Sequence, residues 1–141
     1  DRILRTCYRP YREKVRAWMQ KVSASGRPVL HLSIHSFTPV LHGKRRDFEY
    51  GILYDPKRAG EKVFAARLRT ALQANIPGVR VRMNRPYRGV SDGLTSQLRK
   101  QAGNVRYCGL ELEVNQILVC RPPVRWAAIQ DAVAKAVRRA L

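Results

Sequence analysis

The sequence predicts an α/β fold with a mostly parallel mixed sheet flanked by helices. Short apolar stretches that are typical of strands alternate along the chain with longer stretches whose apolar residues recur at helical spacing. Strands separated by helices favour a parallel arrangement, because each helix carries the chain back across the sheet. The 141 residues suffice for one domain with a real core but not for two. We therefore expect residues 1–141 to form a single domain.

The most informative predicted strand lies between Pro28 and Pro39. Its apolar residues, nearly continuous in the sequence, are Val29, Leu30, Leu32 and Ile34. Such a run predicts a strand that is covered on both faces. The strand would carry His35 and Ser36 to the edge of the sheet, where open α/β folds bind ligands. A neutral imidazole there is suited to hold a metal or to carry a proton, and a satisfied histidine at a strand end fits this stretch equally well.

The other elements follow in order along the chain. Helices are predicted for 9–22, for 60–74, for a short stretch ending at 98 and from 122 onward, and strands for 50–54, 79–83 and 107–114. The residues expected to face the core from the three longer helices are Tyr11, Val15, Trp18 and Val22, then Phe64, Leu68, Ala71 and Leu72, and finally Trp126, Ile129, Val133 and Val137. The clean alternation in 79–83 predicts a half-exposed strand near a sheet edge. The stretch 38–48 is typical of a surface loop beside a site.

The chain is strongly basic, with 28 Lys and Arg against 10 Asp and Glu and a net charge of +18. This charge raises the question of nucleic acid. The basic residues are spread along the chain, however, and no zinc-finger, RNP-like or helix-turn-helix pattern accompanies them. No apolar run approaches the roughly 20 residues that a membrane span needs, so we expect no membrane partner.

The three cysteines are odd in number and widely spaced. They fit neither a disulfide framework nor a zinc–cysteine site, and so indicate a reducing, cytoplasmic setting. The chain opens on Asp1 without Met and without a cleavable apolar leader. We therefore expect a processed chain or a fragment.

Glu111 and Glu113 are the strongest anomaly in the sequence. They lie two residues apart in a predicted strand and should therefore point to the same face, while Leu110, Leu112 and Val114 face apolar packing on the other. Two carboxylates on one strand face call for a metal, an arginine partner or a proton transfer. An ordinary Glu–Arg pairing on an exposed face is the alternative. Beside a histidine from another strand end, the pair resembles hydrolytic zinc sites.

Several separate motifs occur in an order that resembles the C-terminal half of the N-formylglutamate amidohydrolase family. They are His-Leu-Ser-Ile-His-Ser-Phe-Thr-Pro (31–39), Gly43 with Arg46, Gly-Ile-Leu-Tyr-Asp-Pro (51–56), Asn-Arg-Pro-Tyr-Arg-Gly (84–89), Ser-Asp-Gly-Leu-Thr (91–95) and Gly-Leu-Glu-Leu-Glu-Val-Asn-Gln (109–116). The match covers most of the chain from Tyr8 to Gln116. It implies a fold similar to that of the zinc carboxypeptidases (phosphorylase/hydrolase-like) and hydrolysis of N-formyl-L-glutamate to glutamate and formate.

The resemblance also implies roles for three residues. His35 would be a zinc ligand. Glu113 would be the general base that activates the attacking water, and Glu111 is the competing choice for that role. The family's other two zinc ligands, a histidine and an acidic residue, come from a half that precedes this segment. We therefore expect one zinc ion whose remaining ligands lie upstream, an N-terminally truncated chain that is the C-terminal part of the hydrolase domain, and weak zinc binding and little hydrolysis by this chain alone.

A dicarboxylate substrate calls for cations that match carboxylates at two points, which favours arginine over lysine. Arg46 and Arg88 stand in family-like motifs on loops beside the proposed site and are the candidates. Asn84 and Tyr87 could add hydrogen bonds to the substrate. A solvated surface charge is the alternative for either arginine. Two other functions stay open: a basic nucleic-acid-binding module without catalysis, and a hydrolase of the same fold that acts on another N-acyl amino acid.

Overall fold

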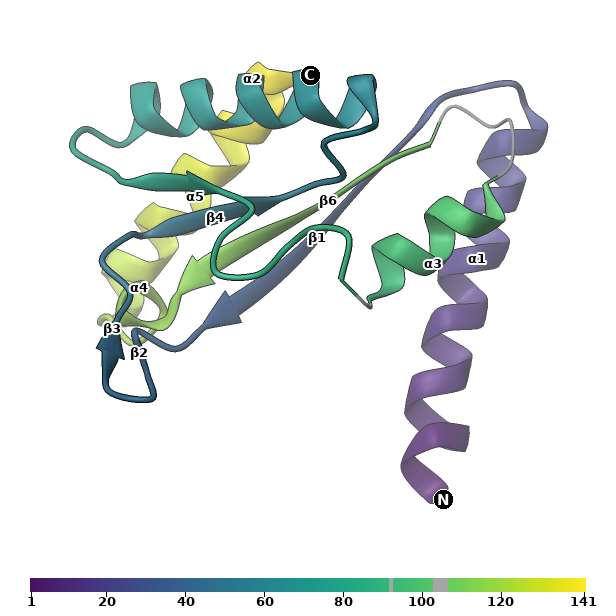
Figure 1. Ribbon diagram of the computed structural model, residues 1–141, viewed down its shortest axis with the longest axis horizontal. Coiled ribbons are helices and arrows are strands. Elements are labelled where there is room, and N and C mark those ends of the chain that lie inside the picture. The colour runs from purple at the N-terminus through teal and green to yellow at the C-terminus, as the bar shows by residue number, and fades with distance from the viewer. Residues whose placement is uncertain (92, 103–106) are drawn as a thin grey trace. The chain divides into compact units, whose positions relative to one another are not determined.

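The computed structural model describes residues 1–91, 93–102 and 107–141 (Figure 1). In chain order its elements are η1 (Leu4–Tyr8, a π-helical turn), α1 (Arg9–Ala24), β1 (Val29–Phe37), β2 (Val40–Leu41), β3 (Lys44–Arg45), β4 (Tyr50–Leu53), α2 (Ala59–Asn75), β5 (Val81–Met83), α3 (Leu94–Gln101), β6 (Tyr107–Asn115), α4 (Gln116–Val119) and α5 (Pro123–Ala140). The chain forms two compact units, and each is described separately below. One comprises Asp1–His31 with Asp92–Gly109, and the other Leu32–Ser91 with Leu110–Leu141.

The first unit packs α1 against α3 and the beginnings of β1 and β6. Its buried cluster consists of Met19, Val29, Leu98, Ala102 and Tyr107, with Val15, Val22 and Leu94 partly buried against it. Val15 and Val22 were expected in the core, and Met19 was not. The expectation for the rest of that helix face is wrong, because Tyr11 is 59% exposed and Trp18 is 66% exposed. Because few elements of this unit pack against α1, only the narrow stripe around Met19 is buried.

The second unit is built on a four-stranded sheet in the order β1-β6-β4-β5. β4 runs parallel to β5 and antiparallel to β6. The predicted α/β fold with a mixed sheet flanked by helices is therefore confirmed, but the parallel arrangement expected from alternating strands and helices does not hold for β4 and β6. The connection between these two strands contains α2, β5 and α3, and is long enough to return the chain in either direction.

β1 is not a strand buried on both faces, so that prediction is wrong. It lies at one edge of the sheet, and its residue Ile34 is 57% exposed. α5 covers the sheet incompletely at this edge, and an apolar hollow of about 480 Å³ separates Leu32 and Ile34 from the helix. The prediction that 79–83 forms a strand near a sheet edge is confirmed, since β5 is the outermost strand on the other side.

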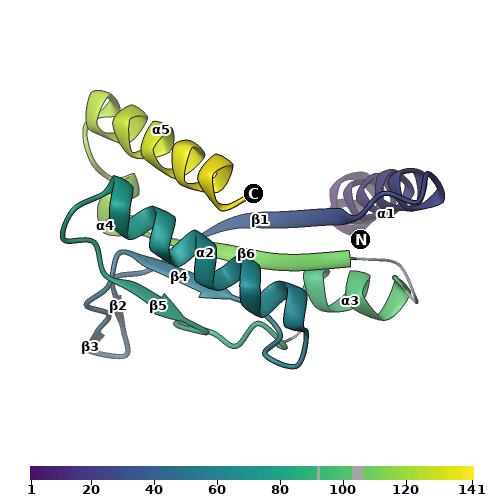
Figure 2. The same ribbon diagram turned by 90° about the horizontal axis from the view of Figure 1, so that it is seen from above.

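α2 and α5 lie over the same face of the sheet (Figures 1 and 2). Phe64, Leu68, Ala71 and Leu72 are buried, as expected for α2. The sheet contributes Tyr50, Ile52, Leu112 and Val114 to the core, all at most 4% exposed. Because side chains alternate along a strand, Gly51, Leu53, Glu111 and Glu113 belong to the opposite face. No described helix is long and apolar enough to cross a membrane.

The stretch 38–48, expected to be a loop, contains the short antiparallel hairpin of β2 and β3. His42 and Gly43 form its turn with φ values of 49° and 71°. Two successive positive φ values give the tight turn whose twist suits a hairpin. This hairpin carries the chain toward Arg46, beside the face of the sheet that bears the two glutamates.

Candidate active site

A row of residues crosses the face of the sheet opposite α2 and α5. Arg82 of β5 pairs with Gly51 of β4, and Gly51 pairs with Glu113 of β6. Residues that are paired across strands point to the same face. Two strand spacings of about 4.8 Å put the backbones of Arg82 and Glu113 about 10 Å apart. The row thus sets a cation and a carboxylate on either side of a residue without a side chain.

Glu113 is buried, with 4% of its surface exposed. Its Oε2 atom has no hydrogen-bond partner within the described part of the chain. Burial raises the pKa of Glu113 above 4.5; the nearby His35 lowers it, Glu111 raises it and Arg46 lowers it. The structure therefore brings His35, Glu111 and Arg46 close to Glu113, and burial makes the Glu113 carboxylate more basic.

His35 stands on β1 with its side chain largely exposed, and its Nε2 atom lies 2.9 Å from the hydroxyl of Ser33. A catalytic zinc ion normally takes three protein ligands. No cluster of three His, Cys, Asp or Glu side chains suited to a metal exists among the described residues. His35 with the two glutamates therefore does not fit a complete zinc site.

Arg46 lies near two aromatic rings. The carbon of its guanidinium is 5.7 Å from the ring centre of Phe37 and 5.4 Å from that of Tyr87. Such contacts orient a cation by the negative faces of the rings. The backbone at Arg46 is also held, since its N–H donates to the Pro39 carbonyl at 2.8 Å. Arg46 is thus a cation with a restricted orientation next to Glu113.

Asn115 secures the same loop from the end of β6, and sequence reasoning assigned it no role. It is 3% exposed, and its Nδ2 donates to the carbonyls of Phe48 at 2.9 Å and of Arg46 at 3.3 Å. Its Oδ1 accepts from the Ile117 N–H at 3.0 Å. An asparagine directly before a helix is a sequence signal for helix capping. No signal in the sequence indicates its hydrogen bonds to residues nearly 70 positions away.

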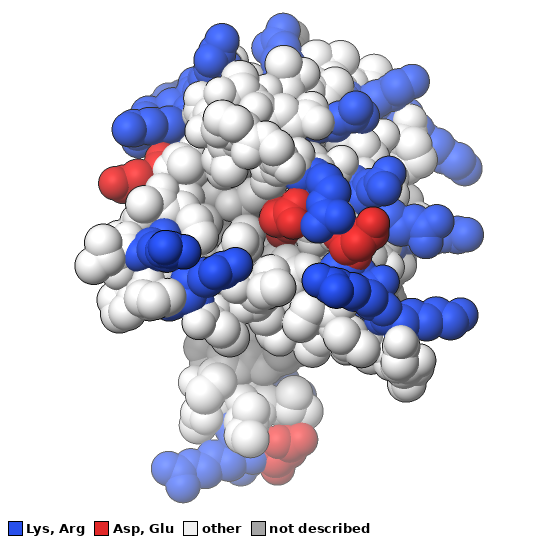
Figure 3. Space-filling model, turned by 90° about the vertical axis from the view of Figure 1, so that its left-hand side faces the viewer, with Lys and Arg blue, Asp and Glu red and all other residues white. Residues whose placement is uncertain are grey.

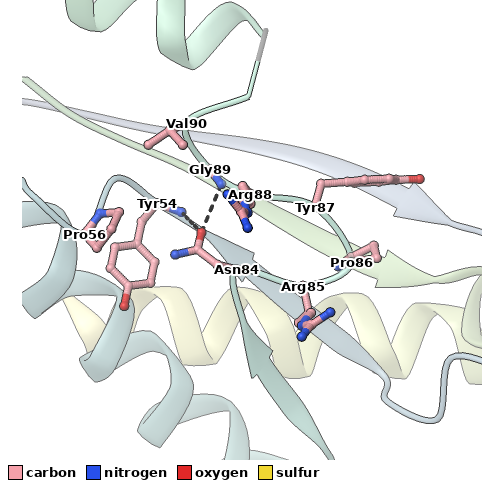
Figure 4. A pocket seen from close by; sticks show the side chains of 9 residues that line it. All are labelled: Tyr54, Pro56, Asn84, Arg85, Pro86, Tyr87, Arg88, Gly89 and Val90. Carbon is pink, nitrogen blue, oxygen red and sulfur yellow. Dashed lines mark hydrogen bonds between the residues drawn. The ribbon is translucent and has the colours of Figure 1, made fainter.

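The loop that follows β5 begins at Asn84, whose φ of 51° is left-handed. The Oδ1 of Asn84 accepts hydrogen bonds from the backbone N–H groups of Tyr54 at 3.1 Å and Gly89 at 3.0 Å (Figure 4). Since Oδ1 holds the loop, a substrate contact by Asn84 would fall to its Nδ2. The loop surrounds an open hollow of about 510 Å³. The residues that line it are Tyr54, Pro56, Asn84, Arg85, Pro86, Tyr87, Arg88, Gly89 and Val90 (Figure 4).

Two glycines allow this loop to lie against the sheet. A Cβ atom on Gly51 would overlap the Arg85 carbonyl oxygen and stand 3.3 Å from the Cβ of Glu113. A Cβ atom on Gly89 would overlap the Tyr54 backbone. A glycine within an apolar strand is the sequence signal for such a close approach. Tyr87 and Arg88, which were predicted to contact substrate, are exposed along the hollow.

Comparisons with known proteins identify the family of the chain and a structural relative. The model of the N-formylglutamate amidohydrolase family matches residues 1–120. The fold is similar to the crystal structure of a gene product from Agrobacterium tumefaciens, with a TM-score of 0.65 and 30% sequence identity. That match covers 96% of this chain and 52% of the other, so the chain spans about half the length of its structural relative. No curated protein matches the chain. The chain belongs to the N-formylglutamate amidohydrolase family.

Proposed function

We propose that the protein containing this chain hydrolyses the amide bond of an N-acyl amino acid, with N-formyl-L-glutamate as the leading substrate. The observation that carries the proposal is Glu113, a buried carboxylate with His35, Glu111 and Arg46 close enough to shift its pKa. Family membership supports amide hydrolysis as the reaction class. The substrate itself is inferred from the family and from the arginines near the carboxylate.

Glu113 would act as the proton carrier of the reaction. In its ionised form it would take a proton from the attacking water, whose oxygen bonds to the formyl carbon. As the C–N bond breaks, the same carboxyl group would pass the proton to the departing amino nitrogen. Burial raises the pKa of Glu113 above its ordinary value, and a carboxylate with a raised pKa is a stronger base for this proton transfer. Glu111 would support this role through its charge, which also raises the pKa of Glu113.

Arg46 and Arg88 would bind the carboxylates of the substrate. The contacts of Arg46 with two rings restrict its orientation, which favours a two-point contact with a carboxylate. Tyr87 contributes one of those rings and lines the neighbouring hollow with Arg88 and Asn84. These three residues would set the far end of the substrate relative to Glu113.

Zinc is part of the proposal only through His35. This residue would supply one ligand, and two more would have to come from outside the described residues, which hold no three-ligand cluster. We propose that the chain contributes the proton carrier and the substrate-binding arginines, while the metal-binding function is completed elsewhere. Hydrolysis should then require a form of the protein that also supplies those ligands.

The test is release of formate from N-formyl-L-glutamate by such a form, with N-formyl-L-aspartate and N-acetyl-L-glutamate as competing substrates. Glu113→Gln should lower kcat about 1,000-fold, because general acid–base catalysis contributes 10²- to 10⁴-fold. Glu13→Gln is the matched control, since Glu13 is an exposed residue of α1, and it should leave kcat unchanged. Retention of activity by Glu113→Gln would remove Glu113 from this role. Failure to cleave any of the three substrates would reject the proposed reaction.

Arg46→Lys separates substrate binding from proton transfer. Lysine keeps the charge but loses the planar, two-point contact, so KM should rise about tenfold with kcat nearly constant. An unchanged KM would show that Arg46 does not bind the substrate.

A further inference from the structure

A second hollow, of about 400 Å³, lies beside the candidate active site and is lined by four arginines. Arg45 and Arg46 come from the end of the β2–β3 hairpin, Arg82 from β5 and Arg85 from the following loop. Phe48 and Pro86 complete its lining together with one acidic residue, Asp47. We call these residues the arginine hollow. Figure 3 shows that Lys and Arg greatly outnumber Asp and Glu on the face of the molecule that it draws.

The charge of the arginine hollow is only partly balanced by the protein, since Asp47 lines it and Glu113 lies near Arg46. Asp47 lies 3.7 Å from Arg80, which also pairs with Glu49 at 2.8 Å. Arg80 is not part of the hollow, so the nearby acids are shared with a cation outside it. Within the described ranges, no salt bridge joins any of the four arginines of the hollow to a carboxylate. Like charges that converge on a concave surface repel one another, and an anionic ligand relieves that repulsion.

The arginines of the hollow extend from backbone that is held in place. The Arg46 guanidinium contacts two rings, and the Arg46 carbonyl accepts a hydrogen bond from Asn115. Arg82 stands on β5, paired with Gly51. Arg85 follows closely and its carbonyl packs over that same glycine. Three of the four guanidinium groups therefore extend from backbone that the sheet or a buried asparagine holds in place.

This arrangement discriminates between kinds of anion. Guanidinium groups form two-point contacts with both carboxylates and phosphates. A single carboxylate brings one charge to four cations, and the two charges of a dicarboxylate stand on separate groups. A phosphate monoester concentrates nearly two charges at neutral pH and three acceptor oxygens on one group. A nucleic acid offers one charge per phosphate along a strand and fits an extended stripe better than a concave hollow. We propose that the arginine hollow binds a doubly charged phosphate group, either free phosphate or the terminal phosphate of a small monoester.

Isothermal titration calorimetry of the 141-residue chain at fixed ionic strength tests this, with inorganic phosphate, O-phospho-L-serine and acetate as probes. Both phosphates should bind at least tenfold more tightly than acetate. Similar affinities for inorganic phosphate and phosphoserine would show that free phosphate is sufficient as the ligand. Tighter binding of phosphoserine would identify a phosphate monoester as the ligand. Equal affinity for acetate and phosphate, or no binding of phosphate at millimolar concentration, would overturn the proposal. Because binding is measured directly, these outcomes do not depend on the proposed hydrolysis.

Variants then locate the site. Arg82→Gln and Arg45→Gln should each weaken phosphate binding about tenfold, the effect of losing one charge-assisted hydrogen bond. Arg69→Gln is the matched control, since Arg69 is an exposed arginine of α2 outside the hollow, and it should change affinity less than twofold. Circular dichroism would verify that each variant is folded. An equal loss of phosphate affinity in Arg69→Gln would show general attraction to surface charge and reject the site. The site would also be rejected if a short single-stranded oligonucleotide bound more tightly than phosphate and all three variants weakened its binding alike.

Discussion

Glu113 of β6 lies directly opposite Gly51 of β4, and the space that a side chain on Gly51 would fill is occupied by the carbonyl of Arg85. The strand pairing therefore does two things at once. It sets the Glu113 side chain beside the space above Gly51, and it lets the loop after β5 enter that space. Burial raises the pKa of Glu113. The chemistry proposed for this residue depends on a neighbour that has no functional group.

Gly51→Ala should therefore destabilise the protein and displace the loop 84–89. The new methyl group would overlap the Arg85 carbonyl, and overpacking of this kind costs about 1–3 kcal/mol. Chemical denaturation measures the loss. Gly60→Ala is the matched control in α2, where a Cβ atom would have nothing within 4 Å, and it should stabilise the protein by about 0.5–1 kcal/mol. Equal effects of the two substitutions would mean that the loop does not need the space at Gly51.

Glu113 should also make the stability of the protein depend on pH. Its folded pKa is raised above 4.5, mainly by burial, so the folded state binds a proton more tightly than the unfolded state. Stability contributed by the protonated form is fully present below 4.5 and is lost as the pH rises through the folded pKa. Glu113→Gln removes this loss, and its melting temperature should exceed that of the parent at pH 7 but not at pH 4.

Thermal unfolding followed by circular dichroism at both pH values checks this, and each kcal/mol gained corresponds to about 3 °C for a chain of this size. Glu13→Gln again serves as the control and should show the same difference between pH 4 and pH 7 as the parent. A Glu113→Gln variant that is no more stable than the parent at pH 7 would contradict the raised pKa.

Local patterns in the sequence predicted which residues share a face but not what covers that face. The alternation in 107–114 correctly set Glu111 and Glu113 apart from the buried Leu112. Helical spacing likewise grouped Tyr11 with Trp18, yet both are exposed. Periodicity reports the geometry of one element, whereas burial depends on a second element that lies far away in the sequence. Ile34 is exposed for the same reason, because α5 leaves a hollow beside β1.

Hydrogen bonds from side chains to distant backbone groups could not be predicted from local sequence patterns either. Asn84 is predicted to contact substrate, but nothing in the sequence indicates that its Oδ1 joins Tyr54 to Gly89. The sequence placed Arg46 in a loop, but its position depends on two rings and on Asn115. The residue types of the candidate site were therefore predictable, while the supports that orient them became apparent only from the fold.

Asn115 provides a prediction about such a support. Asn115→Ala removes two donors to the carbonyls of Arg46 and Phe48, and leaving buried polar groups unpaired costs about 1–3 kcal/mol. Gln116→Ala is the adjacent control, because the Gln116 side chain makes only an exposed bond to Ser36 at 3.3 Å in the described part of the chain. It should cost less than about 0.5 kcal/mol. Urea denaturation measures the free energy of unfolding of both variants. Similar losses in the two would show that the hydrogen bonds of Asn115 do not stabilise the loop.

Tyr50 yields a prediction at the opposite face of the sheet. It is 1% exposed, and its hydroxyl has no hydrogen-bond partner among the described residues. Burial, with a smaller contribution from the charge of Glu49, raises the pKa of Tyr50 to about 12. Removing a buried hydroxyl without a partner relieves a desolvation cost, so Tyr50→Phe should be as stable as the parent or more stable by up to about 1 kcal/mol.

The raised pKa adds a second readout for Tyr50. Its folded form holds the proton more tightly than the unfolded form, so its contribution to stability is lost as the pH rises from 10 toward 12. Tyr50→Phe should therefore resist alkaline unfolding better than the parent, as followed by circular dichroism across this range. Tyr11→Phe, a change at an exposed tyrosine, should leave the alkaline transition unchanged. A Tyr50→Phe variant that unfolds at lower pH than the parent would mean that the hydroxyl stabilises the fold, contrary to its lack of a partner.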